Sequence, residues 1–158
     1  MNPHKTAITR TKPSRPCVKV EPLLINETVI DYGCGKGCDT FYLNGKNIPC
    51  KGYDKYNPVF GEIVAIDHNT VVMCNFVLNT IPQSERIEVL KEIDKAKKVF
   101  ISVRTDKVNG TPHLDGVITS KGTFQTQITV KEWIEFFREH LGEIQVIETK
   151  GYLLVCRS

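Results

Sequence analysis

The sequence has 158 residues, of which 41% are hydrophobic and 25% charged, and this composition suits one globular domain. No apolar run approaches the roughly 20 residues of a membrane-spanning helix, and residues 1–15 contain no apolar signal segment. Six scattered cysteines lack the spacing of a zinc site and favour free thiols. We therefore expect a cytoplasmic protein with no membrane partner and no metal.

Residues 1–20 are predicted to form an extended basic arm ahead of a domain that spans residues 21–158. The arm contains no Asp or Glu, and its cationic residues are Lys5, Arg10, Lys12, Arg15 and Lys19. A solvated tail, an arm that contacts phosphate, and an arm that binds a partner protein all agree with this charge. A fourth reading is a lid over a ligand, with Arg10 or Arg15 meeting a carboxylate.

Next in the chain, residues 27–32 are predicted to form a strand that runs into the stretch VIDYGCGKGCD. In this stretch a glycine occupies every second position, at Gly33, Gly35 and Gly37. Residues 37–44 read as a short helix and residues 49–54 as a second strand that ends on an acid. The order strand, glycine loop, helix, strand indicates a βαβ unit.

Two further strands and a helix are predicted in the middle of the chain. Residues 62–66 read as a strand that ends at Asp67, and the apolar run 70–75 is typical of a buried parallel strand. Residues 84–98 read as a helix with Ser84 as its N-cap.

The last third contains a strand at 99–103, a long polar segment at 104–127, a helix at 129–142 and a hairpin at 143–156. Alternating strands and helices followed by a hairpin predict a single-domain α/β protein. We expect a Rossmann-like fold with a mostly parallel sheet and a C-terminal antiparallel hairpin.

The glycines indicate a ligand site, because ligands of open parallel sheets lie beyond the carboxyl ends of the strands. Glycine lets a ligand approach the backbone closely and accepts a positive φ. The G-x-G-x-G spacing differs from both the dinucleotide fingerprint and the P-loop. Asp54, at the end of the second strand, is placed to accept hydrogen bonds from a ribose. Asp67, after the third, is placed to meet an adenine edge.

This pattern resembles the class I S-adenosylmethionine-dependent methyltransferases, with VIDYGCGKG similar to their first motif and GYDKY similar to their second. The resemblance implies S-adenosylmethionine as the cofactor and S-adenosylhomocysteine as the product. Asp31 would face the methionine end and Asp54 the ribose. The expected cofactor-binding residues are Asp31, Gly33, Cys34, Gly35, Gly37, Asp54, Lys55, Asp67 and Asn75.

A narrower resemblance rests on five segments in a shared order: KTAITRTKPSRP, DYGCGKGCD, GYDKYNP, NFVLNTI and DGVITSKGTFQ. They resemble the methyltransferase-like proteins associated with DNA phosphorothioation systems. This resemblance implies a role in DNA modification. The basic arm favours nucleic acid or a nucleotide-like molecule as the methyl acceptor, while a non-catalytic module that binds the cofactor and acts through a partner protein stays open.

The segment after the fourth strand, residues 74–82, lacks both the [DN]-P-P-[YF] motif of amino-methylating enzymes and the Pro-Cys pair of cytosine enzymes. We therefore expect no covalent role for Cys74. The candidate catalytic residues are Asn75, Asn79 and Asp106, with a capping role open for both asparagines. The candidate substrate-binding residues are Arg10, Arg15, Arg104 and Phe124, with a core position open for Phe124. His113 and Asp115 are further candidate bases.

Overall fold

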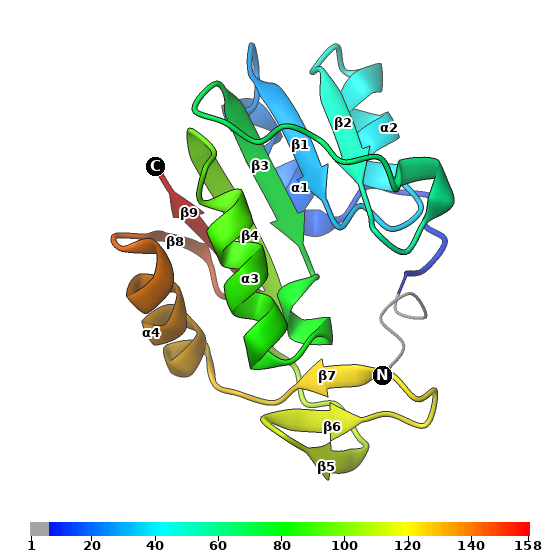
Figure 1. The fold of residues 1–158 in the computed structure, drawn as a ribbon, viewed down its shortest axis with the longest axis vertical. Helices are drawn as coiled ribbons and strands as arrows, with labels where there is room; N and C mark the ends of the chain where they lie inside the picture. The colour runs from blue at the N-terminus through cyan, green and yellow to red at the C-terminus, as the bar shows by residue number, and fades with distance from the viewer. Residues whose placement is uncertain (1–6) are drawn as a thin grey trace.

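The structure, a computed structural model, describes residues 7–158. Its centre is a six-stranded sheet with the order β2-β1-β3-β4-β9-β8 (Figure 1). The strands are β1 (Thr28–Tyr32), β2 (Cys50–Tyr53), β3 (Thr70–Asn75), β4 (Lys98–Arg104), β8 (Gln145–Glu148) and β9 (Tyr152–Arg157). The first four pair in parallel, and β9 and β8 are antiparallel to their neighbours. The predicted α/β fold with a C-terminal antiparallel hairpin is confirmed.

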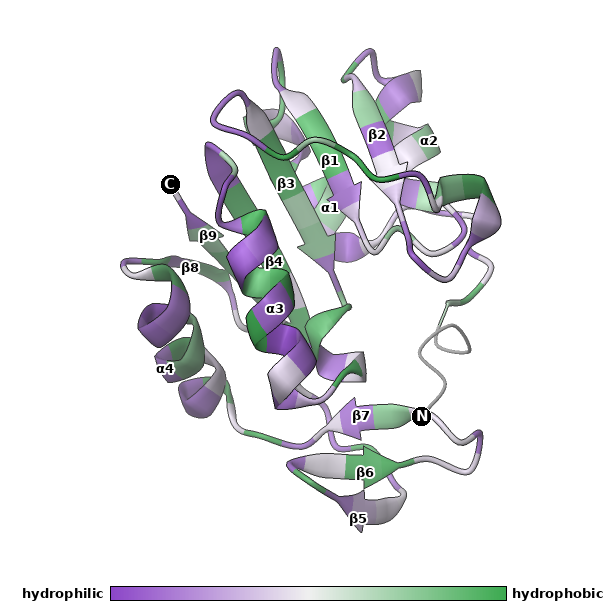
Figure 2. Ribbon diagram, in the orientation of Figure 1, coloured by the Kyte–Doolittle hydropathy of each residue, from purple (hydrophilic) through white to green (hydrophobic). Residues whose placement is uncertain are grey.

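Helices cover both faces of this sheet because successive strand residues point to opposite sides. They are α1 (Arg15–Val20), α2 (Cys38–Gly45), α3 (Gln83–Ile93) and α4 (Val130–Leu141). Val72 and Val99 pack with α3 and α4, whereas Val71 and Phe100 pack with α1 and α2. Figure 2 shows β3 and β4 mostly green, whereas α3 and α4 carry both green and purple bands, as expected of helices with one buried side.

The predicted extended arm is wrong for its last residues, because 15–20 form α1. The hydroxyl of Ser14 accepts the backbone N–H of Cys17 at 3.3 Å, and Pro16 lies in the first turn. Both features are helix start signals. Cys17 and Val20 are buried, so α1 belongs to the core. A 3-10 turn, η2 (Glu21–Leu23), follows it. Residues 1–6, with Lys5, lie outside the described residues.

The predicted strand at 62–66 is also wrong. Val64 and Ile66 point inward as in a strand, but they are buried against the sheet face that α3 covers. The segment therefore crosses the face of the sheet and does not extend its edge. Asp67 follows in a turn, where its carbonyl oxygen accepts the N–H of Thr70 at 3.0 Å. Asp67 thus lies at the amino end of β3, opposite the carboxyl ends of the strands.

The polar segment after β4 contains a small antiparallel sheet, β5 (Thr111–His113), β6 (Gly116–Ile118) and β7 (Phe124–Thr126). Two 3-10 turns, η3 (Pro58–Phe60) and η4 (Leu78–Thr80), follow β2 and β3. Helix α3 begins at Gln83 after Pro82, so the predicted cap at Ser84 is wrong, and it ends at Ile93. The small sheet lies below the carboxyl ends of the parallel strands in Figure 1.

A buried arginine holds the small sheet to the body of the protein. Arg86 lies on the buried side of α3, and its guanidinium donates to both carboxylate oxygens of Asp115 at 2.6 and 2.8 Å. Its Nε donates to the carbonyl oxygens of Leu78 and Ile81 at 3.0 and 2.8 Å. The guanidinium carbon lies 5.3 Å from the ring centroid of Trp133. One side chain therefore joins α3, η4, α4 and the loop before β6.

The outer edge of the sheet at β2 is closed by a side chain. Asn44, near the end of α2, accepts the backbone N–H of Cys50 and donates to its carbonyl oxygen, both at 2.9 Å. These two groups point away from β1, because the neighbouring Pro49 carbonyl is the one that accepts the N–H of Val29. Further along, the N–H of Asp54 donates to the carbonyl oxygen of Phe60 at 2.9 Å.

Candidate functional site

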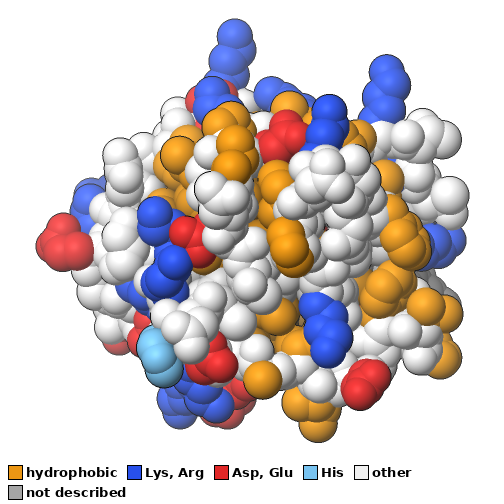
Figure 3. All heavy atoms as spheres, turned by 90° about the horizontal axis from the view of Figure 1, so that it is seen from above, with side chains coloured by type: hydrophobic (Ala, Val, Ile, Leu, Met, Phe, Trp, Pro, Cys, Tyr) orange, Lys and Arg blue, Asp and Glu red, His pale blue; other side chains and the backbone are white. Residues whose placement is uncertain are grey.

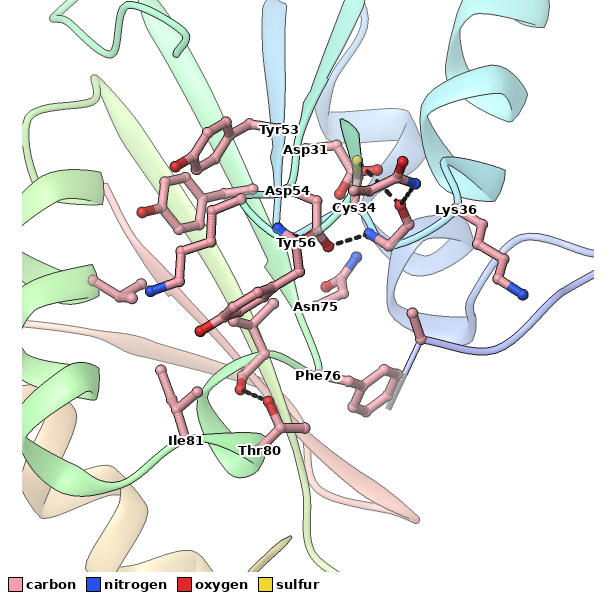
Figure 4. A pocket seen from close by; sticks show the side chains of 18 of the residues that line it. Asp31, Cys34, Lys36, Tyr53, Asp54, Tyr56, Asn75, Phe76, Thr80 and Ile81 are labelled. Atoms are coloured by element: carbon pink, nitrogen blue, oxygen red, sulfur yellow. Dashed lines mark hydrogen bonds between the residues drawn. The ribbon is translucent and has the colours of Figure 1, made fainter. Parts of the chain in front are cut away.

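A cavity of about 870 Å³ opens at the carboxyl ends of β1, β2 and β3. This volume lies within the range of small-molecule sites. Its walls come from the glycine loop, from residues 53–58 at the end of β2 and beyond it, from residues 75–77, 80 and 81 at the end of β3 and beyond it, from one side of α3 and from the arm. Figure 4 shows Asp31, Asp54 and Asn75 converging on it from three different strands.

The glycine loop is shaped so that side chains are excluded. Gly33 has a φ of +75°, and a Cβ there would lie 2.3 Å from Cγ2 of Val77. Gly37 has a φ of +85° at the start of α2, where a Cβ would lie 2.5 Å from the ring of Phe60. Gly35, between them, donates its N–H to Oδ2 of Asp54 at 2.8 Å. The loop backbone and the acid after β2 thus form one unit.

Asp31 is the most deeply buried acid of the cavity wall, with 3% of its surface exposed. The hydroxyl of Thr40 donates to its Oδ2 at 2.8 Å. Burial and, second to it, the nearby charge of Asp39 together raise the pKa of Asp31 to about 7, against the opposing effect of the Thr40 hydrogen bond. Asp31 therefore changes charge near neutral pH.

This pKa predicts a pH dependence of stability. Between about pH 4 and pH 7 the folded protein holds a proton on Asp31 that the unfolded chain has released. The free energy of unfolding should therefore fall as pH rises through this window, by on the order of a few kcal/mol. Urea unfolding from pH 4.5 to 8 measures this slope, and Asp31→Asn should flatten it. An unchanged slope in Asp31→Asn would assign the effect to another group.

Asn75 presents an unused hydrogen-bond donor to the cavity. Its Oδ1 accepts the hydroxyl of Ser102 at 2.8 Å, and Nδ2 is buried without a partner among the described residues. A buried polar group without a partner is costly, so it points to a ligand acceptor atom. The next residue, Phe76, has a φ of +57°, a conformation that non-glycine residues adopt at a cost and that clusters at functional sites.

The arm lies along the cavity and is tied to the glycine motif. The backbone N–H and the hydroxyl of Ser14 donate to the two carboxylate oxygens of Asp39 at 2.7 and 2.6 Å. The ammonium of Lys36 donates to the hydroxyl of Thr9 at 2.8 Å. The guanidinium carbon of Arg10 lies 6.0 Å from the ring centroid of Phe76, the residue after β3. Arg10 and Ser14 line the cavity, as do Ala7 and Ile8.

Sequence reasoning missed one whole wall of the cavity. The rings of Tyr32 and Tyr53, with centroids 5.2 Å apart, form part of it together with Tyr56. Helix α3 contributes three carboxylates, Glu85, Glu88 and Glu92. Their spacing of three and four residues places them on one side of the helix, which was the signal available in the sequence. The pKa of nearby Lys55 is raised, first by its hydrogen bond with Tyr56 and further by the charge of Glu85.

Several predicted site residues lie outside the cavity. Asn79 is buried, donates to the side-chain oxygen of Gln125 at 3.1 Å and accepts the N–H of Arg104 at 3.3 Å. Its amide is thus used to hold β7 and the end of β4. Phe124 is 1% exposed and packs in the interior, the alternative that the sequence left open. A catalytic Asn79 and an acceptor-stacking Phe124 do not agree with these positions.

The remaining charged candidates also point elsewhere. Arg104 and Asp106 form an exposed ion pair with each other, beside a smaller cavity of about 260 Å³. Arg15 lies over the ring of Tyr152, 5.0 Å from its centroid. Asp67 lies at the opposite edge of the sheet. The candidate base Asp115 is bound by Arg86, which lowers the pKa of its carboxyl. The cavity therefore gathers every predicted cofactor residue except Gly37, whose Cβ position is filled by Phe60, and Asp67.

Two negative findings concern the described residues. Over residues 7–158, no three His, Cys, Asp or Glu side chains come together as ligands for a metal ion. Within the same range, no helix is both long enough and apolar enough to cross a membrane.

No protein-family model matches the sequence, and no curated protein matches it. Solved structures do match. The 1,6-didemethyltoxoflavin-N1-methyltransferase of Burkholderia thailandensis, with S-adenosylhomocysteine bound, has a TM-score of 0.64 and 16% identity over 90% of this chain and 77% of that chain. A chain of an RNA repair complex has a TM-score of 0.62 and 14% identity over 92% of this chain and 40% of that one.

A glycopeptide N-methyltransferase complexed with S-adenosylmethionine has a TM-score of 0.61 and 9% identity over 94% of this chain and 88% of that one. At these identities the likeness concerns the fold alone. The sheet order, the glycine loop and the reversed last strand agree with it. The chain has the α/β fold of the class I S-adenosylmethionine-dependent methyltransferases.

Proposed function

We propose that this protein is an S-adenosylmethionine-dependent methyltransferase whose donor-binding domain is formed by residues 21–158, with the arm beside the donor site. The observation that carries the proposal is the unit formed by the glycine loop and Asp54, joined by the Gly35 hydrogen bond at the carboxyl edge of the sheet. This is where an open parallel sheet binds its ligand. The solved structures with S-adenosylmethionine or S-adenosylhomocysteine bound support the choice of ligand.

The residues present fit this donor. Asp54 has carboxylate oxygens that can accept hydrogen bonds from the ribose, and Gly33 and Gly35 line the cavity where the adenosyl group would lie. Asp31 can accept from the ammonium, which favours its ionised form. The unpartnered Nδ2 of Asn75 can donate to an acceptor atom on a ligand. When bound, the donor supplies a methyl group on a sulfonium; the chain's own part is to orient it and exclude water.

For the acceptor we propose nucleic acid or a nucleotide-like molecule, within a cytoplasmic DNA-modification function. The charge of the arm supports this, since Lys12 is exposed next to the cavity-lining part of the arm. One structural neighbour is a chain of an RNA repair complex. The cavity itself has six acidic and three basic lining residues, so phosphates would lie outside it, along the arm. Figure 3 shows Lys and Arg side chains on the opposite edge scattered among other types.

The proposal is tested by calorimetric titration of the full chain with S-adenosylmethionine and with S-adenosylhomocysteine. Binding of both at micromolar or lower concentrations is expected. Transfer of a radiolabelled methyl group is then measured with DNA, RNA and mononucleotides as acceptors. A folded protein that binds neither compound would refute the donor assignment. Binding without transfer to any acceptor would favour the alternative, a module that holds the cofactor and acts through a partner protein.

The variant Asn75→Ala separates these two functions. If the protein is an enzyme, loss of this amide should reduce transfer at least tenfold while binding of S-adenosylhomocysteine changes less, because alignment at the reacting group suffers most. Radiolabel transfer and calorimetry on the same preparation measure the two effects. Ser102→Ala is the matched control for local packing, since it removes only the partner of Oδ1. An Asn75→Ala protein with unaltered transfer would exclude a catalytic role.

A further inference from the structure

We propose that Arg10 binds the carboxylate of the donor's methionine end, and that Ser14 and Asp39 act as positioning residues that hold the arm in place for it. This inference rests on the proposed function and assigns its donor a second recognition element outside the sheet. It follows from the charges that line the cavity, from the attachment of the arm, and from the direction in which the donor must lie.

Few cationic residues line the cavity as partners for an anion. S-adenosylmethionine carries a single carboxylate at pH 7, and the cavity wall is rich in carboxylates that would repel it. A carboxylate that leaves water in such a site needs a cation or several N–H donors. The cationic lining residues among residues 7–158 are Arg10, Lys36 and Lys55. One of these three is expected to meet the donor's carboxylate.

Two of the three cations are engaged or misplaced. The ammonium of Lys36 donates to Thr9, and Figure 4 shows its chain extending away from Asp54 and the centre of the cavity. Lys55 lies at the wall formed by Tyr56 and Glu85, which both act on its pKa. Arg10 has no acidic partner within 4 Å among the described residues, and its planar guanidinium can hold a carboxylate with two parallel hydrogen bonds.

The position of Arg10 matches the methionine end of the donor. In the proposed function the ribose lies at Asp54 and the ammonium at Asp31, which is bonded to Thr40 of α2, so the amino-acid end would point toward Asp31 and the start of α2. The charge of Arg10 reaches the start of α2, where Cys38 is the first residue. Burial and the charge of Asp39 raise the pKa of the Cys38 thiol, and the charge of Arg10 opposes this rise. The ring of Phe76, beneath the guanidinium, limits where it can move.

The arm is fixed at this position by one carboxylate. Asp39 accepts both the N–H and the hydroxyl of Ser14, a buried residue four positions after Arg10. Two charge-assisted hydrogen bonds to one residue fix the direction in which the arm enters α1. Because Asp39 stands in the first turn of α2, directly after the glycine loop, the arm and the loop share one support.

The test compares S-adenosylhomocysteine with its decarboxylated analogue, which keeps the ammonium and lacks only the carboxylate. We expect Arg10→Ala to weaken binding of S-adenosylhomocysteine by about tenfold to a hundredfold, and binding of the analogue by less than threefold. Calorimetry on the full chain measures all four affinities. Lys19→Ala is the matched control, because it removes an exposed charge that lies outside the cavity and should leave both affinities unchanged.

The positioning role predicts the same selectivity in two further variants. Ser14→Ala and Asp39→Asn should each weaken binding of S-adenosylhomocysteine more than binding of the analogue, by a smaller factor than Arg10→Ala. A merely structural role would weaken both ligands equally. Equal losses for both ligands in Arg10→Ala, or no loss for either, would overturn the assignment while the proposed function stands. If the wild-type protein binds neither compound, the proposed function itself fails, and the assignment with it.

Discussion

Replacing Asp54 with alanine is expected to lower the affinity for S-adenosylhomocysteine by about 100-fold or more. The carboxylate has three tasks in the site: its Oδ2 accepts the N–H of Gly35, its Oδ1 accepts the N–H of Tyr56, and its oxygens are the proposed acceptors of the ribose hydroxyls. Hydrogen bonds to a charged group contribute roughly 1.5–3 kcal/mol each, and the loss of two of them gives this factor. Calorimetric titration of the wild-type and variant proteins measures it.

Two control variants define the origin of this loss. Asp54→Asn keeps the shape and one acceptor oxygen, so an intermediate affinity is expected. Asp106→Ala removes a carboxylate of an exposed ion pair outside the cavity, and it should change the affinity by less than threefold. An affinity of Asp54→Ala within threefold of the wild-type value would show that the ribose is not held at this acid, and the donor would then need a different orientation.

Replacing Arg86 with alanine is expected to lower the free energy of unfolding by about 3–5 kcal/mol, the largest stability effect that the structure predicts. The side chain is 2% exposed and its ion pair with Asp115 is made through two hydrogen bonds. Its removal also leaves the carbonyl oxygens of Leu78 and Ile81 without their donor. Urea unfolding at pH 7 measures the difference, and Lys91→Ala, in an exposed pair on the same helix, should cost less than about 0.5 kcal/mol.

The pH dependence of the Arg86 ion pair provides an independent check. Arg86 holds the pKa of Asp115 below its usual value, so the pair stabilises the fold above about pH 4, and this contribution is lost as pH falls through the lowered pKa. The stability difference between the wild-type protein and Asp115→Asn should therefore shrink on acidification below about pH 4. A difference that stays constant with pH would mean that the charge of Asp115 contributes nothing.

The elements that could be predicted are those whose signals are local. The apolar run of β3 marks a buried strand by itself, and α4 begins with a capping box between Thr129 and Glu132. The segment 62–66 shows the limit of such reasoning. Its inward-facing Val64 and Ile66 have the period of a strand, yet this period does not distinguish pairing at a sheet edge from packing across a sheet face.

The residues of the candidate site likewise comprise some that local sequence signals predict and others that they do not. Asp31 and Asn75 lie at the carboxyl ends of their strands and Asp54 follows β2 directly, so the carboxyl-edge rule for parallel sheets predicted their place at the cavity. The carboxylates of α3 and the arm could not be placed, because their positions depend on packing between distant parts of the chain. Ser14 and Asp39 are 25 residues apart, and Arg86 and Asp115 are 29 apart. The sequence does not show which partner makes the burial of a charged residue such as Arg86 possible.

The side chain of Asn44 also has a bearing on how copies of this protein behave toward one another. By occupying both outward-facing backbone groups of Cys50, it removes two of the groups with which a second chain could pair along β2. Beyond the other end of the same strand, the N–H of Asp54 is occupied by the carbonyl oxygen of Phe60. Fewer free backbone groups at this edge disfavour the edge-to-edge growth that leads to aggregation, and Asn44 has this effect without being part of the cavity wall.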